Sequence, residues 1–583
     1  MVRWRLDTPV TASAIAPPPV SRVSRLTRSL LSLGAIAVCA VLGFALFTLP
    51  PAPVLLDVQV RPTTVFGGYH IHTVYSDGSG TPAEVAEAAA RAGLSFVILT
   101  DHGDATRPPD APHYHAGVLV IDAVEISTAE GHLVALGLDA AAPYPLRGEA
   151  RDIIEDVTRL GGWSIAAHPD SQKPDLRWRG PVTSGVEWLN ADSEWRDDAP
   201  SRVLTAALHA LVRPAPAVAG LFGAGTASLR RWDQWGRRTP IVGLAAVDAH
   251  ARIGLDERAE PRAARTLLKQ PSYETMFRTL VQGVWLDAPL SGDAAADSRR
   301  LLNTLRSGRT FSLVRAFADP ADFTVTQDAT QVTASIAGAD DADVIWLRNG
   351  EEVVRGRGQV SAPLVTPGHY RVEVRRPGAR TPWIVSGGIH VPAVPQSVPE
   401  DAGRRANPPL LTATDTGASI DVPLSADTWT LEQHPGSTGE TSVTATGARE
   451  FTYTLGPGRP GSQYAAVVYP IASESLETIR LTASAARPTR VSVQARLPHG
   501  PDGERWVRSV YLDTTPRTVT LRLADFSPAG VIIGRRPIAA RVKDLLFVID
   551  LTNANPGSTG RVWLHHIEVF GPAAGPATVT SGR

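Results

Sequence analysis

The sequence predicts a protein of the α/β class, with a parallel sheet or barrel followed by two β-sandwiches and preceded by one apolar helix. Across residues 67–316, short apolar runs alternate with amphipathic stretches, which is typical of strands joined by helices. From residue 317 onward, apolar and polar residues alternate with the two-residue period of half-buried strands. Residues 30–49 form a charge-free and mostly apolar run.

Composition limits the possible functions of the chain. Its 583 residues, 43% hydrophobic and 20% charged, fit several globular domains. A formal net charge of −1 provides no basic field, so we expect no nucleic-acid partner. The single cysteine, Cys39, excludes an intrachain disulfide and any zinc site built on several thiolates.

The apolar run at residues 30–49 is long enough to cross a bilayer as a helix. The arginine-rich segment 1–29 precedes it, and the next basic residue is Arg61, so we expect residues 1–29 in the cytoplasm and the remaining chain outside. A cleaved signal peptide is the alternative, with a small-x-small match at 43–45. Because the apolar run continues past that match to Leu49, the sequence favours an uncleaved, single-pass membrane anchor.

A short spacer at 50–66 leads into the α/β region at 67–316. There the apolar runs predict strands over residues 95–100, 117–124, 132–138, 164–167 and 241–247. Amphipathic patterns predict helices over 84–92, 149–160, 202–211 and 299–306, with a helical insertion at 213–236.

The C-terminal half is predicted to be β-rich. Residues 317–393 suit an immunoglobulin-like sandwich, with turn signals at Asn349-Gly350 and Pro367-Gly368 and strands over 325–332, 343–349, 370–374 and 383–390. A Pro-rich linker at 394–409 precedes a larger, jelly-roll sandwich at 410–571, which resembles galactose-binding-like modules. We expect a disordered tail at 572–583.

Potential metal ligands occur where the predicted strands end. His70 and His72 flank Ile71, so on an extended strand both project from one face and can chelate one ion. Asp77 follows in a Gly-rich loop. Polar residues at the carboxyl ends of further strands are Asp101, His102, Glu125, His168, Asp248 and His250. Such strand ends form the catalytic face of a β/α barrel, and ligand sets of imidazole and carboxylate suit Zn, Mn or Fe.

In this order, the motifs H-x-H, S-D-G, T-D-H, Glu, A-H-P and D-x-H resemble the polymerase-and-histidinol-phosphatase (PHP) family of metal-dependent hydrolases. The resemblance covers residues 67 to about 314 and implies a distorted seven-stranded β/α barrel with two or three divalent ions and phosphoesterase activity. It implies three ion sites, of which the first takes His70, His72, Glu125 and Asp248, the second Glu125 and His168, and the third Asp77, His102 and His250.

The resemblance implies one more histidine at the second ion, and His132 in AEGHLVALGL is the candidate. Three features look more like the carbaryl-hydrolase-like subgroup of PHP metallohydrolases than like the small phosphatases of the family. They are the short spacing from Glu125 to His132, the segment RRLLNTLRSGRTF and the appended segment TPWIVSGGIHV. The bond cleaved is therefore either a phosphoester or a carbamate, amide or ester.

Catalysis of this type needs no serine or cysteine nucleophile, because divalent ions lower the pKa of water towards ~7 and polarise a phosphoryl or carbonyl oxygen. Asp248 and His250 are candidate catalytic groups. Asp101 is another, but it points to the opposite side of an extended strand from His102, which favours a role in orienting a histidine. Candidate substrate-binding residues at the mouth are Lys173, Arg177, Arg179 and Asn190. A solvated loop is the alternative for the three cations.

Three hypotheses for function follow. The first is an exported, membrane-tethered phosphoesterase acting on a small-molecule or envelope-derived substrate. The second keeps the metal site but changes the bond to a carbamate, amide or ester. The third is a non-catalytic protein that binds envelope glycan through the jelly roll, although tryptophans such as Trp429 and Trp506 are more often core residues than sugar platforms.

Overall fold

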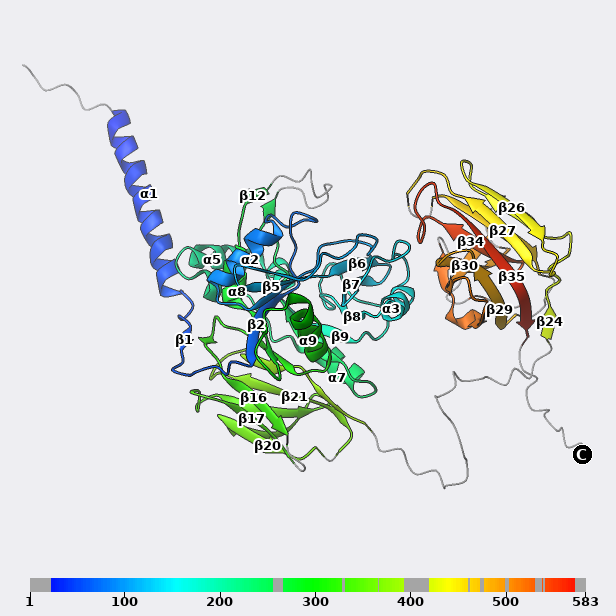
Figure 1. Ribbon diagram of the computed structural model, residues 1–583. Helices are drawn as coiled ribbons and strands as arrows, with labels where there is room; N and C mark the ends of the chain where they lie inside the picture. The colour runs from blue at the N-terminus through cyan, green and yellow to red at the C-terminus, as the bar shows by residue number, and fades with distance from the viewer. Residues whose placement is uncertain are drawn as a thin grey trace, which may run out of the picture.

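The structure is a computed structural model (Figure 1), which describes residues 22–254, 266–327, 331–364, 366–392, 419–459, 462–471, 476–498, 503–529, 537 and 541–571. The linker expected at 394–409, the tail expected at 572–583 and most of the N-terminal segment expected at 1–29 lie outside these residues.

Helix α1 (Arg22–Phe47) contains the apolar run expected to cross a membrane. Its segment Thr27–Phe47 has a mean hydropathy of 2.5, and none of its most apolar 18-residue stretch is buried in the protein. An apolar helix that exposes its side chains all round suits a lipid environment. A signal sequence near the N-terminus also meets these criteria of length and hydropathy, so the anchor is taken up below as a proposal.

The α/β region begins with a strand, a short helix and a second strand. Helix α2 starts at a capping box, in which Thr81 Oγ1 accepts from the Glu84 amide and the Glu84 carboxylate accepts from the Thr81 amide. The elements are β2 (Thr64–Tyr69), α2 (Pro82–Arg91), β3 (Phe96–Leu99), β4 (His113–His115), β5 (Val118–Asp122), β6 (Val124–Thr128), β7 (Gly131–Leu136), α3 (Ala150–Arg159), β8 (Trp163–Ala166), β9 (Gly185–Asn190) and β10 (Val242–Ala246).

These strands lie in two sheets that meet where the strands end. One sheet carries β13 (Val281–Trp285), β2, β3 and β5 in that order, and the other runs β10-β9-β8-β7-β6. Two isolated parallel bridges, Ile71 to Ala249 and His102 to Glu125, join one sheet to the other just beyond β2 and β3. The carboxyl ends of β2, β3, β8 and β10 are thereby held around one point.

Two departures from the expected parallel pattern occur here. The strand expected at 117–124 is interrupted, because β5 ends at Asp122 and β6 begins at Val124. Strand β7 is antiparallel to both β6 and β8. Since β7 runs backwards, His132 near its start lies at the same edge as residues that follow the parallel strands.

The expected helical insertion is present, in several pieces. The insertion expected at 213–236 contains α6 (Pro214–Ala219) and α7 (Thr226–Gly236). It follows α4 (Ala191–Arg196) and α5 (Pro200–Ala210), of which α5 is the helix expected at 202–211. The region closes with α8 (Tyr273–Thr279), β13, α9 (Ala294–Arg306) and β14 (Thr310–Leu313).

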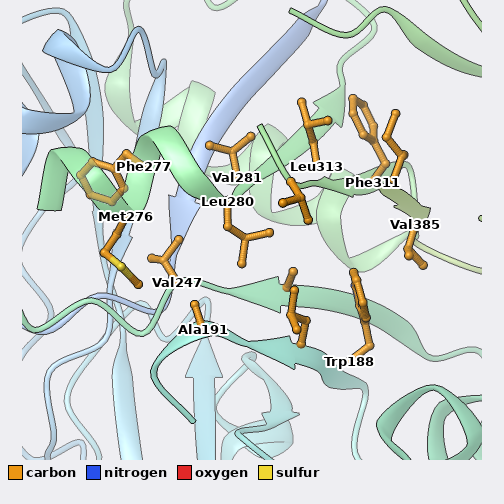
Figure 2. Packing of buried hydrophobic residues seen from close by; sticks show 14 of the residues in the cluster. Trp188, Ala191, Val247, Met276, Phe277, Leu280, Val281, Phe311, Leu313 and Val385 are labelled. Carbon is orange, nitrogen blue, oxygen red and sulfur yellow. The ribbon is translucent and has the colours of Figure 1, made fainter. Parts of the chain in front are cut away.

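The β-rich part that follows is not separated from the α/β region. Strand β14 pairs with β22 (Ile384–Ser386). Together with β18 (Asp343–Arg348), β19 (Glu351–Arg357) and β21 (Gly368–Arg375) they belong to one 11-stranded sheet of the described residues, in the order β19-β18-β21-β22-β14-β13-β2. Figure 2 shows Val385 of β22 beside Phe311 of β14, above Trp188 of β9, within one hydrophobic core. The sheet and the core therefore continue across the boundary expected between residues 316 and 317.

Within this part a second, three-stranded sheet consists of β16 (Phe323–Gln327), β17 (Val332–Ile336) and β20 (Gln359–Ala362). The expectation of one strand over 325–332 is wrong, because Gln327 and Val332 are antiparallel partners in two strands. Likewise 383–390 divides into β22 and β23 (Ile389–Val391). The predicted turn at Asn349-Gly350 is confirmed, because these residues join β18 to β19 and both have positive φ.

Residues 419–571 form two six-stranded sheets around their own hydrophobic core, at the right of Figure 1. One sheet contains β24 (Ser419–Asp421), β26 (Thr438–Val443), β27 (Arg449–Thr454), β29 (Thr478–Ala485), β32 (Arg517–Arg522) and β35 (Thr559–Phe570). The other contains β25 (Thr430–Gln433), β28 (Tyr464–Pro470), β30 (Thr489–Leu497), β31 (Glu504–Leu512), β33 (Ser527–Ala529) and β34 (Asp544–Asp550). The jelly-roll class of this C-terminal sandwich stays a prediction.

A buried arginine connects the C-terminal sandwich to the α/β region. Arg490 of β30 donates from Nε to Asp156 Oδ2 at 2.7 Å and from one terminal nitrogen to Asp156 Oδ1 and the Asp152 carbonyl, both at 2.8 Å. Burial opposes the charged form of Arg490, but Asp156 and Asp152 outweigh it and raise the pKa of the guanidinium. Nearby, the Arg159 guanidinium lies 3.5 Å from the centre of the Tyr511 ring.

We predict that Arg490→Met weakens the attachment of the sandwich to α3, because the buried Asp156 would lose its cation from the sandwich and keep only Arg159 of its own helix. Loss of one partner of a buried ion pair costs about 3–5 kcal/mol. Thermal unfolding should then show the C-terminal sandwich melting separately and earlier. Arg522→Ala, at an exposed position of β32, is the control and should unfold like the parent. An unchanged melting profile of Arg490→Met would contradict the prediction.

Candidate metal centre

The nine predicted ligand side chains come together at the edge where the two sheets meet. His70 and His72 follow β2, His102 follows β3, and His168 follows β8. Glu125 lies in β6 and His132 in β7. Asp77 lies in the loop before α2, and Asp248 and His250 follow β10. Residues up to 180 positions apart in the sequence thus converge on one site.

Three of these residues have an unusual backbone conformation. His70, His168 and Asp248 have φ values of 66°, 29° and 46°, in the left-handed region that non-glycine residues rarely adopt. Each such residue costs of order 1–3 kcal/mol, and surrounding contacts must offset that cost. At His70 the contacts include a hydrogen bond of 3.3 Å from the Ala249 amide to its carbonyl. This backbone conformation turns the three side chains inward at the point where each strand ends.

The loop that carries Asp77 depends on the glycine that follows it. A Cβ on Gly78 would lie 2.1 Å from the carbonyl oxygen of His72, so only glycine permits this close approach. The approach places Asp77 Oδ1 3.4 Å from His72 Nδ1 and Asp77 Oδ2 3.2 Å from His250 Nε2. The S-D-G motif therefore has a structural role beyond the carboxylate itself.

Glu125 lies at the centre of the histidines, and only 1% of it is exposed. Its Oε2 is 3.3 Å from His70 Nε2, 3.2 Å from His72 Nε2 and 3.2 Å from His102 Nδ1. Its Oε1 is 3.0 Å from His132 Nδ1 and 2.9 Å from His168 Nε2. The two oxygens of one carboxylate thus face two different sets of imidazoles, the arrangement expected of a carboxylate that bridges two ions.

Unpartnered buried atoms show that this ligand set fits a cation. His70 Nε2, His72 Nε2 and Asp248 Oδ1 are buried and have no hydrogen-bond partner among the described residues. They lie within 4.8 Å of one another. Buried polar atoms without a partner are costly, and three of them facing one point suit a divalent ion held by two imidazoles and a carboxylate.

Two further groups adjoin this one. The first consists of His72, Asp77, His102 and His250, and the second of His102, Glu125 and His132. The first contains Asp77, His102 and His250, the residues of the implied third site. The second shares Glu125 and His132 with the implied second site but contains His102 in place of His168. The donor set is imidazole and carboxylate throughout, which suits first-row divalent ions.

The electrostatics of the site hold its carboxylates in their charged form. Burial would raise the pKa of Glu125, but His102, His70 and His132 outweigh it and lower this pKa well below its ordinary value. Burial lowers the pKa of His72, yet the neighbouring carboxylates of Asp248, Glu125 and Asp77 raise it to about 10. For His102, burial dominates and lowers the pKa to about 4. Ions and protons therefore compete for the same nitrogen atoms.

Sequence reasoning missed Glu187, which lies in β9 and is fully buried. Its Oε1 lies 2.6 Å from His70 Nδ1, the ring nitrogen that faces away from Glu125. Its Oε2 accepts from the His168 amide at 2.8 Å and from Asn190 Nδ2 at 2.9 Å. A carboxylate on the outer nitrogen of a ligand histidine fixes the orientation of the ring. The available signal was an acid inside the otherwise apolar strand VEWLN.

We predict that Glu187→Gln weakens metal binding about 10–100-fold, because His70 would lose the carboxylate that orients its ring. Chelator competition against Zn²⁺ or Mn²⁺ measures this affinity. Glu87→Gln, at an exposed position of α2, is the matched control and should bind metal like the parent. Equal affinities in the two variants would show that Glu187 does not support the site.

Two other candidates lie behind the ligands instead of among them. Asp101 accepts from the Thr73 amide at 2.7 Å and from Ser76 Oγ at 2.6 Å, and Ser76 Oγ lies 3.3 Å from His72 Nδ1. Asp101 therefore reaches His72 only through Ser76, in agreement with an orienting role. Asn190 caps α4 by accepting from the Ser193 amide at 2.9 Å, so its side chain is engaged within the protein.

A cavity of about 380 Å³ opens over the ligand cluster. Lys173 lines it, as do Arg196 and Arg252, which the sequence did not single out. Arg177 and Arg179 are not among its lining residues; Arg177 Nε donates to the Ser171 carbonyl at 3.1 Å, and one terminal nitrogen of Arg179 donates to the Pro174 carbonyl at 2.7 Å. Among the three cations expected at the mouth, only Lys173 faces this cavity.

Comparison with known proteins gives one similarity in sequence. The chain is 36% identical over 80 residues to a 3',5'-nucleoside bisphosphate phosphatase of Chromobacterium violaceum. The match covers 13% of this chain and 28% of the relative, so the chain spans less than a third of the length of that protein. No protein-family model matches.

Two solved structures are similar to different parts of the chain. A two-domain protein of Bacteroides vulgatus, containing a predicted PHP-like metal-dependent phosphoesterase, is 14% identical with a TM-score of 0.28, covering 58% of this chain and 99% of its own. A family 11 carbohydrate-binding module of Clostridium thermocellum is 16% identical with a TM-score of 0.22, covering 27% of this chain and 98% of its own. TM-scores this low carry no argument for the function of either part.

Proposed function

We propose that the chain is a PHP-type metal-dependent hydrolase with a distorted seven-stranded barrel, and that it acts as a phosphoesterase. The observation that carries this proposal is Glu125, whose two oxygens face separate sets of histidines beside the unpartnered atoms of His70, His72 and Asp248. The short match to a phosphatase of C. violaceum supports the same reaction class.

The ligand groups suit two or three divalent ions of Zn, Mn or Fe. When bound, such ions activate water near neutral pH and stabilise negative charge on a phosphoryl oxygen. The protein's own part is to hold the ligands in place: Glu187 orients His70, Asp101 acts on His72 through Ser76, and Asp77 stays beside His250. Asp248 and His250, which line the cavity, are the candidate side chains for moving a proton.

Cations at the cavity favour an anionic substrate. Lys173, Arg196 and Arg252 come from three separate segments of the chain and line the same cavity as the ligands, where Arg196 is paired with Asp192. A phosphate ester matches this charge and a carbamate does not, so the cations favour the phosphoesterase over the carbamate, amide or ester hydrolase. A nucleoside bisphosphate, the substrate class in the name of the C. violaceum relative, is the first compound to test.

We predict that His70→Ala with His72→Ala removes both metal retention and turnover, because these residues supply two of the three unpartnered ligand atoms. Purified protein would be analysed for bound metal and assayed on phosphomonoesters, nucleoside 3',5'-bisphosphates, phosphodiesters, carbamates and esters. His113→Ala with His115→Ala, a second H-x-H pair outside the cluster, is the matched control and should leave both properties intact.

Full activity in the His70/His72 variant would rule out the metal-dependent hydrolase. Hydrolysis of carbamates but not of phosphate esters would replace the phosphoesterase with the alternative. Metal retained by the parent without activity on any compound of the panel would favour the non-catalytic glycan-binding protein.

We predict that Lys173→Ala raises KM for a phosphate ester about tenfold with a smaller change in kcat, because a charge-assisted hydrogen bond of roughly 1.5 kcal/mol would be lost from substrate binding. Steady-state kinetics with the best substrate of the panel measures the change. Arg179→Ala, a matched cation of the same loop that does not line the cavity, should keep the parental KM. Equal effects of the two substitutions would contradict the assignment of Lys173.

The proposal includes a location. Helix α1 would be a single-pass anchor, with the catalytic region on the extracytoplasmic side, as the arginines before it indicate. Glycan binding by the C-terminal sandwich stays a prediction. Trp429 and Trp506 belong to its core, with 6% and 3% exposure, so neither provides a platform for a sugar ring.

A further inference from the structure

Helix α5 presents an apolar face to solvent. Apolar residues recur at positions 204, 207, 208, 211 and 212, the spacing that puts side chains on one face of a helix and of the turn that ends it. Leu204, Leu211 and Val212 are 65%, 81% and 57% exposed, and the only buried residue of the helix is His209. An amphipathic helix normally buries such a face, so this one lacks a partner within the described residues.

The end of α1 lies against the same helix. Thr48, which directly follows α1, has its Oγ1 3.0 Å from His209 Nε2. A terminal nitrogen of Arg213 donates to the Pro50 carbonyl at 2.6 Å and so ties the segment after α1 to the turn between α5 and α6. Figure 1 shows α5 beside the end of α1. The apolar face therefore lies where the chain leaves its candidate membrane span.

We propose that the apolar face of α5 lies in the outer surface of the same bilayer that α1 crosses. A helix of this kind buries its apolar face about 5–10 Å into the boundary between headgroups and acyl chains. The inference rests on the anchor included in the proposed function and is independent of the hydrolase chemistry. A bilayer is the occupant because the contact between Thr48 and His209 holds α5 at the level where an uncleaved span ends.

This contact has a consequence for the substrate cavity. Helix α4, which ends at Arg196, contributes Asp192, Trp195 and Arg196 to the cavity lining, and α5 begins only four residues later at Pro200. With α5 on the bilayer, the rim formed by α4 is held close to the lipid surface. The enzyme would then meet substrates released at, or carried by, that surface.

The test uses full-length protein in lipid nanodiscs and depth-dependent quenching of a fluorescent probe. The single cysteine, Cys39, lies in α1 and reports on the anchor when labelled in the unsubstituted chain. On a Cys39→Ser background, Leu211→Cys and Leu204→Cys report on α5, and Ala227→Cys at an exposed position of α7 is the matched control. Nitroxide lipids carry the quencher either near the headgroup or near the end of the acyl chain.

The proposal predicts strong quenching at positions 211 and 204 by the nitroxide near the headgroup, weaker quenching by the deep nitroxide, and none at 227. Quenching at Cys39 without quenching at 211 and 204 would overturn the contact of α5 while leaving the anchor in place. Shielding of the α5 probes from water without lipid quenching would mean that a protein surface or a second copy covers the face, and would also overturn the proposal. Absence of quenching at Cys39 would remove the anchor itself, whatever the outcome of the activity assays.

Discussion

The arrangement of the α/β region depends on one buried carboxylate. Glu125 lies 2.9–3.3 Å from nitrogen atoms of five histidines, and these histidines come from three strand ends and from β7. A buried charge without partners costs several kcal/mol, so Glu125 is tolerable only where all of these imidazoles, or ions held by them, surround it. The His102–Glu125 and Ile71–Ala249 bridges join the two sheets and so bring these imidazoles around Glu125.

Strain and support occur together at this point. Positive φ at His70, His168 and Asp248 is unfavourable by itself, and the dense core beneath the sheets, with Tyr69, Ile71 and Val247 almost fully buried, leaves the backbone no relaxed alternative. Glu187 adds a second carboxylate behind the ligands and hydrogen-bonds both the His70 ring and the His168 amide. These contacts hold the imidazoles in place within the protein, which favours geometrically selective binding of an ion.

Local patterns in the sequence were sufficient to single out the nine histidines and carboxylates that the fold brings together, because each lies at the end of an apolar run or in a short motif. They were also sufficient for helices α2, α3, α5 and α9. They failed where structure depends on distant pairing. No local sequence pattern predicts that Phe311 pairs with Ser386, a pairing that joins two expected domains into one sheet. Nor does any local pattern predict that β7 runs antiparallel to β8. Glu187, Arg196 and Arg252 were missed for the same reason, since only the fold brings them to the site.

The parts on either side of the α/β region are tied to it by polar contacts. Arg490 and Arg159 join the C-terminal sandwich to α3, and Arg213 joins the segment after α1 to the helical insertion. These contacts would fix the catalytic cavity relative to the membrane on one side and the sandwich on the other. A site placed in this way is suited to substrates that reach it along a surface.

Anomalous diffraction from crystals soaked in Mn²⁺ tests the central claim most directly. The account predicts at least two metal peaks about 3.5–4 Å apart, one contacted by His70, His72 and Asp248 and another by His132 and His168, with Glu125 contacting both. A single peak, or peaks that Glu125 does not contact, would contradict it.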